Sequence, residues 1–200
     1  MLFVRDLPTA TAALVFGEIA CPHDGCGGTL GPWGWARERS VRRSGGSHER
    51  HRPRRGRCRD CRRTQVLAEP RALPRHADAV ETVGAALLGA VEGAGYRSIA
   101  AELGLAATTV RGWLQRARSN SEPVRQQATR WLLALDPNAD PPEPTGTVLG
   151  DMVNAVGQAV AAWVRRFGPV GSPWRTAVLL GAAPLLSPPR RRGTRFAPDR

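Results

Sequence analysis

The sequence predicts a mainly α-helical protein that carries a small β part with two cysteine pairs near its N-terminus. Hydrophobic residues make up 42% of the 200 residues, enough for real cores. The two cysteine pairs frame a segment of alternating apolar residues, and from Ala77 onwards apolar residues recur at steps of three and four. We therefore expect an N-terminal zinc ribbon, then a three-helix bundle with a helix-turn-helix, and then C-terminal helices.

The four cysteines predict a metal site. Cys21 and Cys26 lie in "CPHDGCGG", and Cys58 and Cys61 lie in "CRDC", with 31 residues between the pairs. This spacing is typical of a four-thiolate Zn²⁺ site with no open coordination position, and such a site is structural. A redox C-x-x-C would leave the first pair unexplained, and disulfides need an oxidising compartment, so both are weaker interpretations. His23 could replace one of the sulfurs as a ligand, but a surface histidine in the loop is the favoured interpretation.

Local sequence suggests how each cysteine pair turns. Gly25, Gly27 and Gly28 allow left-handed backbone around the first pair. Arg62 follows Cys61 at a place where zinc knuckles commonly have glycine, so the second turn departs from the usual pattern.

The chain between the cysteine pairs should form strands and a loop. In "TLGPWGWAR" the alternating pattern puts Trp33 and Trp35 on the same face of a strand. We expect them to cover the ribbon core there, and base stacking is the alternative. "RTQVLAE" is the expected return strand. "RRSGGSHERHRPRRGR" has the composition of a mobile loop that becomes ordered only on a phosphate backbone.

The charge is strongly positive and concentrated. The net charge is +12, and all 29 basic residues are arginine. Residues 37–75 hold fourteen arginines and four acidic residues, a net charge of +10. This block indicates a polyanionic partner, most plausibly nucleic acid, although a solvated basic loop would look the same. The predicted phosphate contacts are Arg54, Arg55 and Arg57.

A helix-turn-helix is predicted after the ribbon. One apolar face, which includes Leu88 and Val91, predicts a helix from about residue 77 to 93. In "YRSIAAELGLAATTVRGWLQRARS" the small Ala100, the turn residue Gly104 and the apolar Val110 occupy the positions that a helix-turn-helix needs. The outward face of its second helix should reach base edges in the major groove; the alternative is a merely solvated face. The predicted DNA-contacting residues of this face are Thr108, Thr109, Arg111, Gln115 and Arg116.

The four-cysteine ribbon running into "RHADAVETVGAALLGAVEGAGYRSIAAELGLAATTVRGWLQRAR" resembles a family of short bacterial zinc-ribbon helix-turn-helix proteins of undetermined function. It is also similar to the DNA-binding N-terminal regions of insertion-sequence transposases. The resemblance covers Cys21 to about Arg118, roughly half of the chain. It implies a metal-stabilised module that recognises DNA through the face of the second helix.

The remaining chain is assigned by composition and periodicity. Ser121 and Pro123 are expected to start a further helix, and the Pro-rich stretch interrupts the C-terminal helices as a linker. After the linker, the apolar periodicity from Leu149 to Phe167 predicts an amphipathic helix. The predicted divisions are an N-terminal strand and helix (1–20), the zinc ribbon with its basic loop (21–70), the helix-turn-helix (75–120), C-terminal helices (121–187) with a linker (136–147), and a disordered basic tail (188–200).

The expected function is sequence-specific binding of double-stranded DNA, as a transcriptional regulator or as an accessory recognition protein of a mobile element. The C-terminal helices are candidates for self-association or for binding a transposase. The alternatives are a protein-interaction scaffold and a catalytically incomplete transposase fragment. We expect no enzymatic activity, because half of the six acidic residues after Ser121 lie in the linker and no run of strands surrounds them to form a catalytic domain. We also expect no membrane segment, and a cytoplasmic, nucleoid-associated location.

Overall fold

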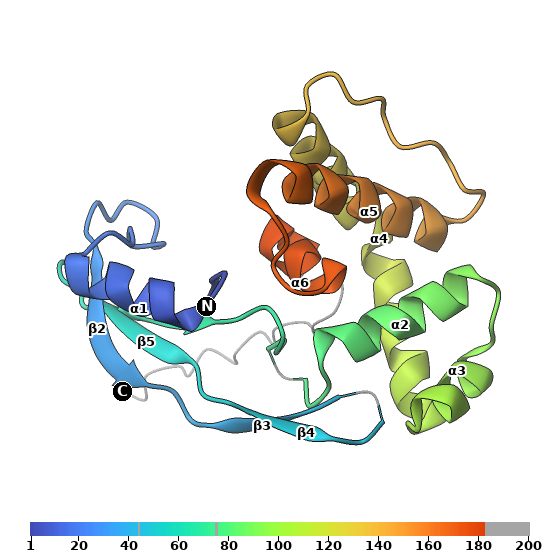
Figure 1. The fold of residues 1–200 in the computed structure, drawn as a ribbon, viewed down its shortest axis with the longest axis horizontal. Helices are drawn as coiled ribbons and strands as arrows, with labels where there is room; N and C mark the ends of the chain where they lie inside the picture. Colours follow the sequence, from blue (N-terminus) through green and yellow to red (C-terminus); the bar gives the residue numbers. More distant parts are fainter. Residues whose placement is uncertain (44, 75, 183–200) are drawn as a thin grey trace, which may run out of the picture.

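The computed structural model describes residues 1–43, 45–74 and 76–182. About half of these residues are helical, and the other regular structure is a small mixed sheet and a two-stranded hairpin (Figure 1). The prediction of a mainly α-helical chain with a small β part is confirmed at this level. The predicted basic tail, 188–200, and the end of the last predicted helix lie outside the described residues.

The N-terminal part is a four-stranded sheet with the order β1-β6-β5-β2. β1 pairs in parallel with β6, and the other two pairs are antiparallel, so the chain before the first cysteine adds a strand to the cysteine-containing sheet. The expected return strand after Cys61 is confirmed as β6. The bounds of the four strands are Leu2–Phe3 (β1), Leu30–Trp35 (β2), Arg54–Cys58 (β5) and Thr64–Ala68 (β6).

Helix α1, Leu7–Phe16, covers this sheet (Figure 1). The helix begins where the Asp6 side chain accepts a hydrogen bond from the Thr9 backbone N–H, and it ends at Gly17 with a φ of 72°. Leu14 is fully buried, and its Cδ2 would lie 2.8 Å from a Cβ at position 56, so the glycine there lets helix and sheet approach closely. Leu30 and Leu67 share this small core with Cys21 and Cys58.

The described residues of the basic segment between β2 and β5 form a hairpin where composition predicted a loop. Its strands are β3, Arg39–Arg42, and β4, His48–His51, in antiparallel register. Val41 is buried against Ala72 and Ala79, and the Arg42 guanidinium contacts Asp78 at 2.6 Å. These contacts fasten the hairpin to the chain just before α2, and composition alone does not report them.

The helical part forms one continuous core. The first predicted helix is present, but Leu88 and Val91 of its predicted inner face are 43% and 38% exposed. The helices are α2 (Val80–Val91), α3 (Tyr96–Leu103), α4 (Ala107–Leu135), α5 (Val148–Phe167) and α6 (Pro173–Ala177), followed by the π-helical turn η1 (Val178–Ala182).

Helix α4 is continuous through the predicted boundary at residues 120 and 121, so the separate helix expected to start at Ser121 is wrong. Pro123 lies inside α4 and cannot donate a backbone hydrogen bond. Ser121 is fully buried, and its hydroxyl donates to the Ala117 carbonyl at 2.8 Å. Val124 and Leu132, buried in the shared core, continue the apolar face beyond the proline. Tertiary packing thus outweighs the local helix-breaking signal.

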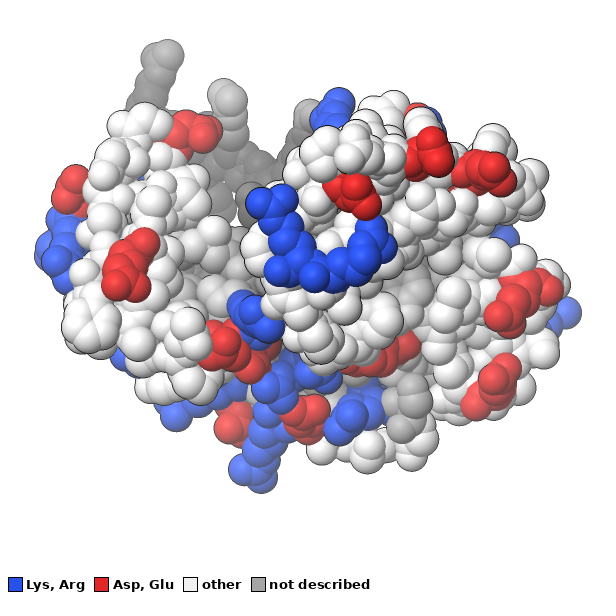
Figure 2. Space-filling model, turned by 45° about the horizontal axis from the view of Figure 1, so that its top comes forward, with Lys and Arg blue, Asp and Glu red and all other residues white. Residues whose placement is uncertain are grey.

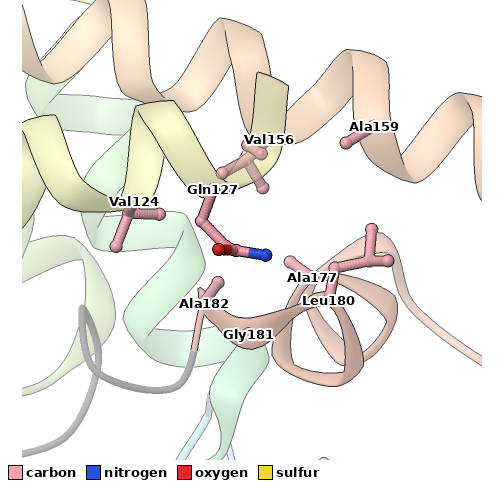
Figure 3. A pocket seen from close by; sticks show the side chains of 9 residues that line it. Val124, Gln127, Val156, Ala159, Ala177, Leu180, Gly181 and Ala182 are labelled. Carbon is pink, nitrogen blue, oxygen red and sulfur yellow. The ribbon is translucent and has the colours of Figure 1, made fainter. Parts of the chain in front are cut away.

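The predicted amphipathic helix from Leu149 to Phe167 is confirmed as α5. The side chains between α4, α5 and the α6–η1 segment leave a space of only about 10 Å³, into which Gln127 extends (Figure 3). That volume is close to the space of one water molecule, so it holds no organic ligand. Within the described ranges, none of the helices has both the length and the apolar character of a bilayer span.

Candidate metal centre and basic surface

The four cysteines come together at one end of the sheet. Their sulfur atoms all lie within 4.8 Å of one another, with 3.7 Å between Cys21 and Cys61 and 3.6 Å between Cys26 and Cys58. A disulfide would need about 2.05 Å, and all four thiols are free. Four sulfurs at about 2.3 Å around one tetrahedral ion would be about 3.8 Å apart, so the donor set fits a metal ion.

Two backbone turns aim the sulfurs at the centre. Gly25 has a φ of 72°, as the glycine-rich sequence predicted. Arg62 has a φ of 62° and is the one non-glycine residue with a positive φ in the described chain, so the second turn adopts the glycine-like conformation without a glycine. Its carbonyl accepts a hydrogen bond from Arg57 Nε at 3.0 Å, which helps hold this unusual backbone.

Gly28 does not have a positive φ, so the prediction of left-handed backbone there is wrong. Close packing explains this glycine instead. A Cβ at position 28 would lie 2.6 Å from the Asp60 carboxylate. The first cysteine turn therefore packs directly on the second. A Cβ at position 27 would have no atom within 4 Å, and the φ of Gly27 is also not positive, so neither reason requires a glycine there.

The thiols differ in their local electrostatics. Burial raises the pKa of Cys21 to about 12. Burial also acts upward on Cys58, but hydrogen bonds from the backbone N–H groups of Cys61 and Asp60 outweigh it and lower the Cys58 pKa to about 7. Cys58 is therefore the thiol whose surroundings most favour the thiolate that a metal binds.

His23 does not belong to the cluster. Its Nε2 lies 3.1 Å from Gln65 Nε2 and its Nδ1 lies 3.4 Å from Arg63 Nη1, so both ring nitrogens face other side chains. The four-sulfur set is the one that the fold assembles.

The predicted arginines of β5 lie on the sheet beside two exposed tryptophans. Arg54 donates to the Gly34 carbonyl at 3.0 Å, and the Arg57 and Arg54 guanidinium carbons lie 4.4 Å and 4.7 Å from the ring centres of Trp33 and Trp35. Arg55 is partly exposed, and its side chain has no ion pair with the described residues. Arg54 and Arg57 thus have internal partners that the sequence did not predict.

The expectation that both tryptophans cover the ribbon core is wrong. Trp33 is 48% exposed and Trp35 is 46% exposed. The core beneath the sheet is already filled by α1, and β2 has a register shift between Pro32 and Trp35. Strand alternation alone could not foresee either effect.

The predicted face of the second helix lies at the start of α4. Thr108, Arg111 and Gln115 are exposed, whereas Thr109 is half-buried. Arg116 turns inward: its Nη1 is buried, and its charge is close enough to His76 to lower the pKa of that imidazole, which burial already depresses, to about 4. Arg116 is therefore less exposed than Thr108, Arg111 and Gln115, and its contact with DNA stays a prediction.

Basic side chains are unevenly distributed over the surface. On the face seen in Figure 2, arginines lie along the lower and left edges and form a further group in the middle, while acidic side chains are scattered over both the left and the right parts. Several arginines of residues 37–75 pair internally: Arg42 with Asp78, Arg43 with Glu49, Arg50 with Glu38, and Arg71 with Glu49 and Glu69. Within the described residues, Arg52, Arg54, Arg55 and Arg57, in or beside β5, have no such ion pair.

His76 contacts Trp113, with 6.1 Å between the ring centres. Apolar periodicity does not predict this contact, because a histidine that precedes a helix adds nothing to that pattern.

Comparison with models of known protein families, with curated proteins and with solved structures finds no match to this chain.

Proposed function

We propose that this protein binds double-stranded DNA in a sequence-specific manner, with a structural Zn²⁺ ion in the sheet and a helix-turn-helix formed by α3 and α4. The observation that carries the proposal is the exposed polar face at the start of α4. Thr108, Arg111, Gln115 and Arg118 follow one another at steps of three and four and are all exposed. Arginine and glutamine hydrogen-bond to guanine and adenine edges in the major groove.

The junction of α3 and α4 supports the helix-turn-helix assignment. Gly104 ends α3 with a φ of 65°, and a three-residue turn leads into α4. Ala100 and Val110 are buried on either side of this turn, at 2% and 0% exposure. A small residue, a left-handed turn and an apolar contact across the corner are what this motif requires.

Zinc is the metal that the proposal assigns to the cysteine cluster. Tetrahedral sets of four thiolates bind zinc or iron, and such a closed site has no position for a substrate. The metal would act by joining the two cysteine turns, and the proposal includes no catalytic step. Metal analysis of protein purified without chelator should find one zinc per chain; iron or no metal would contradict the assignment.

The proposal covers a transcriptional regulator and an accessory recognition protein of a mobile element, which share this DNA-binding chemistry. Selection of bound duplexes from a random pool should yield a preferred site. On it, Arg111→Ala should cost roughly 1 to 3 kcal/mol and relax the base choice at one position. Arg130→Ala, an exposed arginine near the other end of α4, is the matched control. Equal losses for both variants on every duplex would show that α4 contributes only charge.

A further inference from the structure

Trp33 and Trp35 lie on an open edge of the sheet. β2 pairs only with β5 within the described chain, so its other edge has no strand beside it. Both indoles are nearly half exposed, and neither belongs to a hydrophobic core cluster. Large exposed aromatic side chains on one strand need a reason other than packing, and a binding surface is such a reason.

The strand is shaped to display these rings. Gly34, between the two tryptophans, has a φ of 82°, and the register shifts at this point. Arg57 lies over Trp33 and Arg54 over Trp35, and Arg52 also approaches Trp35 at 5.9 Å. These cation–π contacts hold the rings in place without a core around them. The result is a row of aromatic and guanidinium planes on the surface.

The charge around the rings selects an anionic partner. Within the described residues, Arg52, Arg54, Arg55 and Arg57 have no carboxylate within 4.0 Å, since the ion pairs of this region involve other arginines. A partner that offers flat aromatic groups and repeated negative charge is a nucleic acid. We propose that Trp33 and Trp35 stack unpaired bases of single-stranded DNA, while the arginines of β5 contact its phosphates.

The exposed rings favour a single strand over a duplex. In an intact duplex each base is paired and stacked on its neighbours, so its flat face is not open to an indole on the protein surface. The bases of a single strand can unstack and lie on Trp33 and Trp35, which are 48% and 46% exposed. This site is distinct from the exposed face of α4 and does not depend on it.

A first test uses the unmodified protein. A labelled oligothymidylate of about 15 nucleotides should bind at least about fivefold more tightly than an abasic oligonucleotide of the same length and charge, as measured by fluorescence anisotropy. Equal affinity would show that only phosphates are recognised and would overturn the proposal.

A second test uses variants. Trp33→Ala together with Trp35→Ala should weaken oligothymidylate binding at least about tenfold, whereas Trp33→Phe with Trp35→Phe should retain most of it. Phe167→Ala is the matched control, because Phe167 is 45% exposed and has Arg166 over its ring at 5.5 Å, but lies on α5. Failure of the phenylalanine pair to retain binding would overturn base stacking.

Arg111→Ala separates this proposal from the proposed function. It should leave oligothymidylate affinity unchanged while weakening binding to the selected duplex. Loss of oligothymidylate binding in Arg111→Ala would place the single strand on α4 and overturn the assignment to the sheet. A chain that binds the oligothymidylate through its tryptophans but selects no duplex would refute the helix-turn-helix function alone.

Discussion

Replacement of Gly28 by alanine tests how the two cysteine turns fit together. The new Cβ would lie 2.6 Å from Cγ and Oδ2 of Asp60 and 2.9 Å from its Cβ. Because the Asp60 Cβ is fixed to the backbone between Cys58 and Cys61, rotation of the carboxylate alone cannot relieve the contact. The two turns must move apart.

The size of the effect follows from the overlap. An ordinary contact to a Cβ begins at 3.4 Å, so the turns must separate by several tenths of an ångström. Metal–ligand distances tolerate only about 0.2 Å, so in the proposed zinc-bound form part of the strain falls on the ion. Overpacking of this kind costs about 1 to 3 kcal/mol, so metal binding weakens by at most roughly 5- to 150-fold.

Competition between the protein and a chelator for Zn²⁺ measures this loss. Gly27→Ala is the control, because nothing lies within 4 Å of its new Cβ and its φ is not positive. Asp60→Gly in the Gly28→Ala background should restore the affinity, since it removes every atom in the overlap. If Gly28→Ala and Gly27→Ala bind zinc equally, the packing of one turn on the other is refuted.

Two further predictions concern the helical part. Gly84→Ala should destabilise the protein by about 1 to 2 kcal/mol in urea denaturation, because the new Cβ would lie 2.2 Å from the Trp174 indole. In a Trp174→Ala background the same substitution should instead stabilise the protein by up to about 1 kcal/mol, because alanine has the higher helix propensity. The same sign of the effect in both backgrounds would refute the docking of α6 on α2. Burial, and then the charge of Arg116, lower the pKa of His76 from 6.5 to about 4. Between these two pH values the unfolded chain binds more protons than the folded chain. The stability that is present above pH 6.5 is therefore lost as the pH falls towards 4. His76→Phe should reduce that loss in a series of urea midpoints against pH, and an unchanged profile would contradict a buried neutral imidazole.

Several features follow from local sequence alone. Two short cysteine pairs can each make a turn without help from the rest of the chain, so their spacing was enough to predict one cluster, which the sulfur distances confirm. Gly104 adopts the left-handed φ expected at the end of α3, because side-chain sterics make glycine the residue best suited to that conformation. Apolar periodicity likewise predicted the amphipathic face of α5, whose buried residues follow it along the helix.

Other features depend on which surfaces meet. Val41 and Arg42 order the basic hairpin only because Ala79 and Asp78, far along the chain, lie beside them. Pro123 remains inside α4 because the core continues on both sides of it, and Arg116 turns inward beside His76. Trp33 and Trp35 stay exposed because Leu14 of α1 already fills the sheet core. Burial is a property of contacts between distant segments, whereas propensity and spacing describe only neighbours in the chain, so these positions were decided by the tertiary structure.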